Sequence, residues 1–121
     1  MSTLRVNTLQ DATGSNQPAM VGAAKAWVNF DGTGTPSIRQ AFNVSSITDN
    51  GTGDYTINFT NAMVDTSYSV CGTSGAGSGH WAVVFSPYTA SIQTTSSMRF
   101  RTFGSASTLQ DQDFITASIF R

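Results

Sequence analysis

Apolar and polar residues alternate along several short stretches of this chain, and turn-forming residues separate the stretches. Between residues 26 and 30, Ala26, Val28 and Phe30 fall on one face and Trp27 on the other. Such alternation puts one set of side chains on the buried face of a β-sheet and the other set in solvent. The pattern predicts strands at residues 26–30, 38–47, 55–59, 68–72, 81–85, 92–103 (broken near residue 96) and 113–120. We expect these side chains of the second and third strands to point inward: Ile38, Phe42, Val44, Tyr55, Ile57 and Phe59.

The breaks between the stretches have the chemistry of β-turns. Asp31-Gly32, Asn50-Gly51 and Gly53-Asp54 supply residues that tolerate left-handed backbone conformations, and residues 73–79 form a glycine-rich loop. Short strands separated by turns are typical of sandwiches and small barrels. The sequence therefore predicts an all-β fold in residues 22–121, a jelly-roll-like β-sandwich of about seven to eight strands.

The two ends of the chain differ from the middle. In residues 1–21, Leu4, Val6 and Leu9 are spaced through a polar segment that becomes rich in turn-forming residues, so we expect an extended docking arm and a linker. Fully stretched, this arm would reach roughly 70 Å. The last predicted strand is apolar on both faces, which favours a place between neighbouring strands or a subunit interface. The residues that we expect in this interface are Phe114, Ile115, Ile119 and Phe120.

Composition supports a β protein and excludes several classes. Only 11% of the 121 residues are charged, there is no Glu, and Lys25 is the only Lys. The net charge of −1 argues against nucleic-acid binding, and no apolar run approaches a signal peptide or a membrane span, so we expect cytoplasmic synthesis without membrane insertion. So few charges protect poorly against association, which favours a permanent oligomer. The single cysteine, Cys71, excludes an intrachain disulfide and is predicted to be a small buried residue.

Catalytic, metal-binding and cofactor-binding signals are weak. His80 is the only His, so any catalytic dyad would need it, and the glycine-rich loop lacks the spacing of a nucleophile elbow or a phosphate loop. Residues 49–54 and 111–113 bring oxygen-bearing side chains together, but a hairpin turn and a solvated turn explain them better than a cation site. A pair of glycosidase carboxylates stays open, because their separation is a property of the fold. We expect a protein without catalytic activity, metal or cofactor.

Binding is the better functional candidate. His80, Trp81 and Tyr88 border two predicted loops, and aromatic rings offer flat faces for stacking against sugar rings. The tryptophans are also explained by a place in the core or an interface. We therefore take His80, Trp81 and Tyr88 as the candidate site for a bacterial surface glycan or receptor.

Three blocks of the chain resemble the short tail-fibre-like virion proteins of tailed phages that infect cyanobacteria and other aquatic bacteria. They are S-T-L-R-V-N-T-L-Q-D at residues 2–11, K-A-W-V-N-F-D-G-T-G-T at residues 25–35 and F-N-V-S-S-I-T-D-N-G-T-G-D-Y-T-I-N-F-T at residues 42–60. Residues 72–112 match less clearly. The resemblance implies a homotrimeric all-β structural protein on the virion surface and carries over no catalytic residue.

Two virion roles follow from this resemblance and stay open at this point. The chain would be a trimeric knob at a tail-fibre or receptor-binding tip, or a cement protein that decorates the capsid and grips the shell through its arm. In either role its partners would be its own copies and other virion proteins. A glycan-cleaving depolymerase and a lectin are the competing classes.

Overall fold

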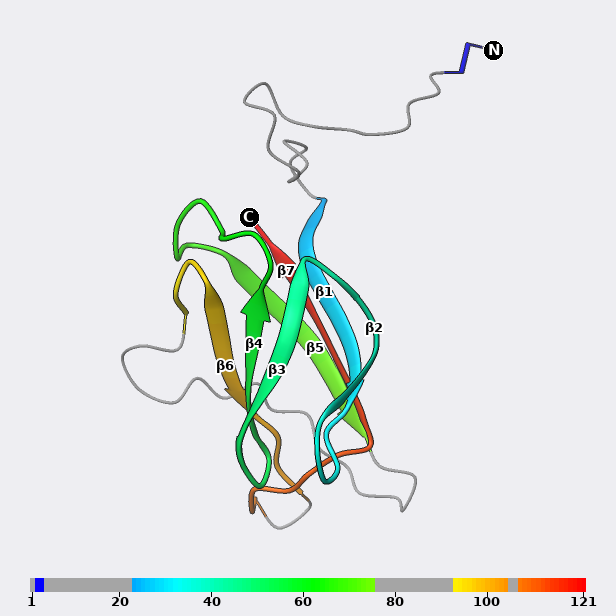
Figure 1. Cartoon of the computed structure of the whole chain (residues 1–121), viewed down its shortest axis with the longest axis vertical. Helices are drawn as coiled ribbons and strands as arrows, with labels where there is room; N and C mark the ends of the chain where they lie inside the picture. The colour runs from blue at the N-terminus through cyan, green and yellow to red at the C-terminus, as the bar shows by residue number, and fades with distance from the viewer. Residues whose placement is uncertain (1, 4–22, 76–92, 105–106) are drawn as a thin grey trace.

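The computed structural model describes residues 2–3, 23–75, 93–104 and 107–121 of the chain (Figure 1). These residues form seven β-strands and no helix. The strands are β1 (Ala24–Asp31), β2 (Ser37–Phe42), β3 (Val44–Gly51), β4 (Asp54–Phe59), β5 (Ser69–Gly75), β6 (Ser97–Arg101) and β7 (Phe114–Phe120). The predicted all-β fold is confirmed. The strand predicted at residues 81–85 lies outside the described residues.

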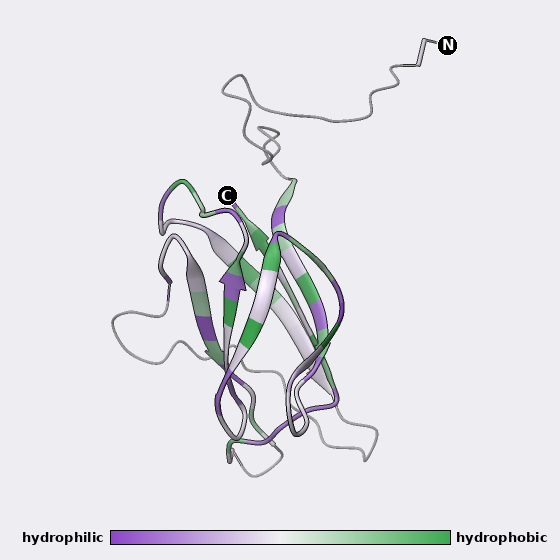
Figure 2. Cartoon of the chain, in the orientation of Figure 1, coloured by the Kyte–Doolittle hydropathy of each residue, from purple (hydrophilic) through white to green (hydrophobic). Residues whose placement is uncertain are grey.

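The strands form two antiparallel sheets that face each other, as in a β-sandwich. A four-stranded sheet has the order β2-β1-β7-β5, and a three-stranded sheet has the order β3-β4-β6. The last strand, β7, lies between β1 and β5, which confirms that it is inserted between neighbouring strands. Figure 2 shows apolar and polar residues alternating along the arrows of both sheets. The jelly-roll connectivity remains a prediction.

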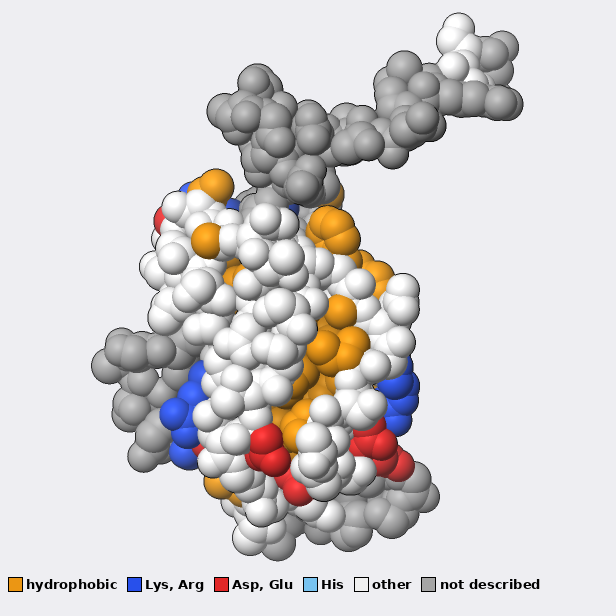
Figure 3. Space-filling model, viewed as in Figure 1, with side chains coloured by type: hydrophobic (Ala, Val, Ile, Leu, Met, Phe, Trp, Pro, Cys, Tyr) orange, Lys and Arg blue, Asp and Glu red, His pale blue; other side chains and the backbone are white. Residues whose placement is uncertain are grey.

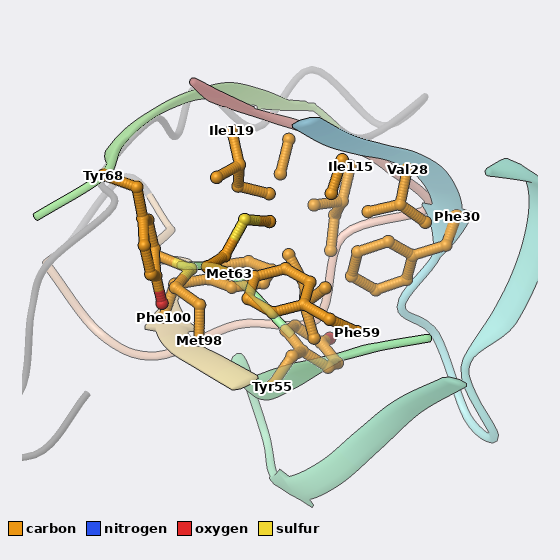
Figure 4. Packing of buried hydrophobic residues seen from close by; sticks show 13 residues of the cluster. Val28, Phe30, Tyr55, Phe59, Met63, Tyr68, Met98, Phe100, Ile115 and Ile119 are labelled. Atoms are coloured by element: carbon orange, nitrogen blue, oxygen red, sulfur yellow. The ribbon is translucent and has the colours of Figure 1, made fainter. Parts of the chain in front are cut away.

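The core fills the space between the two sheets. Val28 and Phe30 of β1 and Tyr55 and Ile57 of β4 are at most 1% exposed, as their alternation predicts. The ring centroid of Phe30 lies 5.4 Å from that of Tyr55 and 6.2 Å from that of Phe100, in edge-to-face arrangements that aromatic pairs favour (Figure 4). The other members of the buried cluster are Ala26, Phe59, Met63, Tyr68, Met98, Ile115, Ala117 and Ile119.

The chain changes sheets at Asn43, where the sequence predicted a single strand over residues 38–47. Asn43 has φ of 54° and separates β2 in one sheet from β3 in the other. Its side-chain amide donates to the carbonyl oxygens of Lys25 and Asn61, and its Oδ1 accepts from the backbone N–H of Asn61. Asn tolerates the left-handed conformation better than most residues, and these hydrogen bonds fix the corner.

Phe42 was predicted to point inward, and this prediction was wrong, whereas Ile38 does point inward as predicted. The pairing of β1 with β2 has a β-bulge in which Arg39 of β2 is the extra residue, so Phe30 pairs with Ile38 and Val28 pairs with Ala41, and Ala41, not Phe42, shares the inner face. Phe42 pairs with Trp27 on the outer face and is 39% exposed. Ile38 points inward but lies on the edge strand, where it is 37% exposed.

The turns predicted at Asp31-Gly32 and at residues 50–54 are confirmed, whereas residues 73–75 of the predicted glycine-rich loop belong to β5 and residues 76–79 lie outside the described residues. The β3–β4 hairpin turns through Gly51 and Gly53, both with positive φ, and the Asp49 carboxylate accepts from the N–H of Gly51 at 2.9 Å. The β1–β2 turn is held in the same way, because the Asp31 carboxylate accepts from both the N–H and the hydroxyl of Thr33.

Candidate functional site

The predicted site residues separate into three groups in the structure. His80, Trp81 and Tyr88 lie outside the described residues, and so do the arm residues Leu4, Val6 and Leu9. Ile115 and Ile119 are 0% exposed and pack in this chain's own core, so they are not placed to contact another subunit. Phe114 and Phe120 point to the opposite side of β7, and Phe114 is 46% exposed.

The outer side of the four-stranded sheet carries a concentration of aromatic side chains, which we call the aromatic face. It is defined by Trp27, Phe42, Phe114 and Phe120. Trp27 lies at the centre, because it is the register partner of Phe42 on one side and of Ser118 on the other. Small neutral residues surround the rings: Asn29, Gln40, Ser69, Cys71, Thr73, Thr116 and Ser118.

Cys71 belongs to this face, so its predicted burial was wrong. It is exposed and pairs with Ser118 across β5 and β7. Its neighbour Val70 points inward, and alternation along the strand therefore turns Cys71 outward.

The described charges of this face are confined to one end and are paired. The Arg39 guanidinium lies 3.5 Å from the Asp31 carboxylate and 6.0 Å from the centre of the Phe114 ring. It also donates to the carbonyl oxygen of Asp113. Hydrogen bonds from Thr33 and the charge of Arg39 lower the pKa of Asp31. The four aromatic residues that define this face and the residues named around them are neutral, so desolvating them would cost little compared with a charged surface.

The outer side of the three-stranded sheet is polar instead. Asp54 accepts from Arg99 at 2.7 and 2.9 Å and from Arg101 at 3.0 Å. Its side chain is only 7% exposed, and the hydrogen bonds from Arg99, followed by those from Arg101, lower its pKa. Farther along this surface, Asn58 donates to the hydroxyls of Ser46 and Thr48. The two outer sides of the sandwich thus differ sharply in chemistry.

Asp111 and Gln112 were predicted to form a solvated turn, and the structure corrects this. The Asp111 carboxylate accepts from the Tyr55 hydroxyl at 2.7 Å and from the N–H of Gly53 at 2.7 Å. The Tyr55 hydroxyl also lies 2.8 Å from the carbonyl oxygen of Gly32, and burial and then the Asp111 carboxylate raise its pKa. The protonated Tyr55 hydroxyl thus connects the turn at Gly32 with the segment that contains Asp111. Gln112 is 0% exposed, and its side-chain amide has no hydrogen-bond partner among the residues that the structure describes.

The aspartates of the β3–β4 hairpin do not converge on a common point. Asp49 binds the backbone of its own turn, whereas Asp54 is paired with two arginines. Within the described part of the chain, no three His, Cys, Asp or Glu residues gather as metal ligands would. No helix there has the length and apolar character needed to cross a membrane.

Acid is expected to destabilise the fold through its aspartates. The pKa values of Asp31 and Asp54 are lowered in the folded state, and that of Asp65, which is paired with Arg121, is lowered to about 2. Such carboxylates stabilise the fold above their unfolded pKa of about 3.9, and this contribution is lost as the pH falls through the lowered values. We expect the unfolding temperature to stay level down to about pH 5 and to fall between about pH 4 and pH 2.

The Asp54→Asn variant isolates the part of this acid destabilisation that is due to Asp54. It keeps the size of the side chain but removes the titrating group, so the acid-induced fall in unfolding temperature is expected to be smaller than in the wild type. Circular dichroism melts over this pH range measure both. Parallel curves for the two proteins would show that Asp54 does not contribute to the pH dependence.

Comparisons of the chain with protein-family models, with curated proteins and with solved structures found no match.

Proposed function

We propose that this protein is a structural component of a tailed-phage virion, a homotrimeric β knob displayed on the particle surface as a tail-fibre or receptor-binding tip. Two of the sequence blocks that resemble such proteins correspond to well-defined parts of the fold. Residues 25–35 cover most of β1 and the turn after it, and residues 42–60 cover the corner at Asn43 and the β3–β4 hairpin. The resemblance therefore involves the framework of the sandwich.

The observation that carries the association is the aromatic face. Aromatic rings surrounded by small neutral groups are typical of the centre of a protein–protein interface, where charged residues are depleted. A neutral surface can also face copies of itself without repulsion between like charges. The aromatic face thus supports contact between identical subunits, as a closed homo-oligomer requires. The described residues offer no comparable arrangement for catalysis.

Solution mass tests this step of the proposal. We expect the full chain to sediment at about three times its monomer mass of 12.8 kDa. Phe42→Asp places a charge on the aromatic face and is expected to weaken association roughly a hundredfold, because a charge would be desolvated in the interface. The matched control is Thr48→Asp on the polar outer side of the other sheet, where the carboxylate can still accept from Asn58. A monomeric wild type, or equal weakening by the two variants, would contradict the proposal.

A capsid cement protein is the second candidate, because a β-sandwich preceded by the docking arm that the sequence predicts over residues 1–21 also suits a bead fixed to a shell. Quantitative mass spectrometry of purified particles distinguishes the two roles by copy number. A tail location gives a small number of copies set by the tail, whereas decoration of the shell gives copies in proportion to the capsid subunits. Absence of the chain from purified particles would contradict both roles.

A further inference from the structure

The sandwich is open along one side, between the edges of its two sheets. Four apolar residues point toward this opening: Ile38 and Ala41 from β2, and Val44 and Ile47 from β3. All four remain partly exposed. Figure 3 shows apolar side chains lining a hollow in this face of the molecule, between β3 and β2. We call this hollow the edge groove.

The outer edges of two strands border the edge groove. β2 is the first strand of the four-stranded sheet and β3 is the first strand of the other, and within the described ranges no strand pairs with the outer edge of either. Such edges present rows of N–H and C=O groups that can take up another strand. A groove with an apolar floor and open backbone edges is suited to an extended segment with alternating apolar side chains.

Residues 4–9 of this same protein have the required pattern. Leu4 and Val6 are two residues apart, so in an extended strand both would point to one face together with Thr8, while Arg5 and Asn7 would point to the other face, which ends in Leu9. The segment carries a single charge, that of Arg5. Burial of a Leu or Val side chain is worth about 1.5–3 kcal/mol, which gives the pairing a driving force beyond its hydrogen bonds.

The point at which the arm joins the sandwich favours the groove of a neighbouring copy. β1 begins at Ala24, and the next residue, Lys25, accepts from Asn43, so the arm starts at the end of the groove where β2 and β3 meet. A return into the same groove would need a connection of only a few residues. The connection available is instead residues 10–21, which reach roughly 40 Å when extended, whereas the eight residues of β3 span about 26 Å.

We propose that the edge groove binds residues 4–9 of a second copy of this chain as an added β-strand. Each copy then contributes a strand to its neighbour, and the exchange covers the apolar opening and at least one free edge. This association needs copies of the chain to meet but does not depend on a place in a virion. It uses a different surface from the aromatic face, so either contact can fail while the other is retained.

Disulfide trapping between two differently tagged full-length chains tests the exchange. Both chains carry Cys71→Ser; one also carries Val6→Cys and the other Ile47→Cys. On co-expression and mild oxidation we expect a covalent heterodimer. The matched control replaces Ile47→Cys with Thr48→Cys, whose side chain points to the opposite side of β3, and is expected to give no more than background. If the disulfide forms only when Val6→Cys and Ile47→Cys share one chain, the arm occupies its own groove and the proposal is wrong.

Hydrogen exchange provides a measurement that does not depend on the introduced cysteines. In the full chain, Leu4→Asp combined with Val6→Asp is expected to speed amide exchange in β2 or β3 by roughly tenfold or more, since a lost strand exposes their edge amides. Exchange in β4, which is paired on both sides, is expected to stay unchanged. Unchanged exchange in both β2 and β3, like absence of any trapped species, would overturn the proposal.

Discussion

Replacing Phe30 with Ala is expected to lower the free energy of unfolding by about 3–5 kcal/mol. Phe30 is 0% exposed, and its ring packs edge-to-face against those of Tyr55 and Phe100 from the opposite sheet. Truncation would remove these contacts and leave a cavity between the sheets that the β-scaffold cannot close. Urea unfolding followed by tryptophan fluorescence measures the change.

Phe42→Ala is the control for this prediction, because it removes the same ring from the outer side of the neighbouring strand. Loss of this ring is expected to weaken the association between subunits. The unfolding temperature of this variant is therefore expected to depend more steeply on protein concentration than that of the wild type. The loss in Phe30→Ala is expected at every concentration. If both variants lost equal stability under all conditions, the division between core and aromatic face would be wrong.

The buried and exposed sides of β1 and β4 could be predicted, because the local alternation of apolar and polar residues determines them. Val28, Phe30 and Ile57 each follow a polar or outward-facing residue, and each is buried as the pattern requires. The same rule could have placed Cys71 outside, because Val70 before it is the inward residue. Its burial was inferred from the usual preference of cysteine instead, and strand geometry overrode that preference.

The corner at Asn43 was missed because alternation continues across it. Phe42 and Val44 are two residues apart and look like one face of one strand, yet the left-handed backbone at Asn43 sends them to different sheets. A positive φ leaves only a weak signal in the sequence when the residue is Asn and not Gly. The bulge at Arg39 of β2, which moves Phe42 to the outer face, leaves no recognisable signal in the sequence.

The polar contacts of the candidate surfaces depend on pairings between distant segments. Arg99 and Arg101 are two residues apart and so share a face of β6, which the sequence could have indicated. Their common partner Asp54 is defined only by the register of β4 against β6. In the same way, the buried bond between Tyr55 and Asp111 joins residues that are 56 positions apart. Local patterns therefore predict on which side of a strand a residue lies, whereas the polar contacts between distant residues depend on the register of the strands.

Gly53 marks a place where the backbone of three segments is packed too closely for any side chain. It has φ of +62°, and a Cβ there would lie 2.5 Å from the carbonyl oxygen of Thr102 and 2.6 Å from the backbone nitrogen of Gln110. The Gly53 carbonyl accepts from the N–H of Thr102, and its N–H donates to Asp111, so the neighbouring backbone cannot move away without breaking hydrogen bonds. Gly53→Ala combines backbone strain with this clash and is expected to cost about 3 kcal/mol or more.

Gly34→Ala separates the strain from the clash. Gly34 has nearly the same φ, +59°, but a Cβ there would meet nothing within 4 Å. Its cost is therefore limited to the left-handed conformation, about 1 kcal/mol, part of which is offset by the lower entropy of the unfolded chain. Urea midpoints measured at one protein concentration compare the two variants, and similar losses would mean that Gly53 is not held between the Thr102 and Gln110 backbones. A much larger loss in Gly53→Ala would show that this contact joins the β3–β4 hairpin to the segment leading into β7.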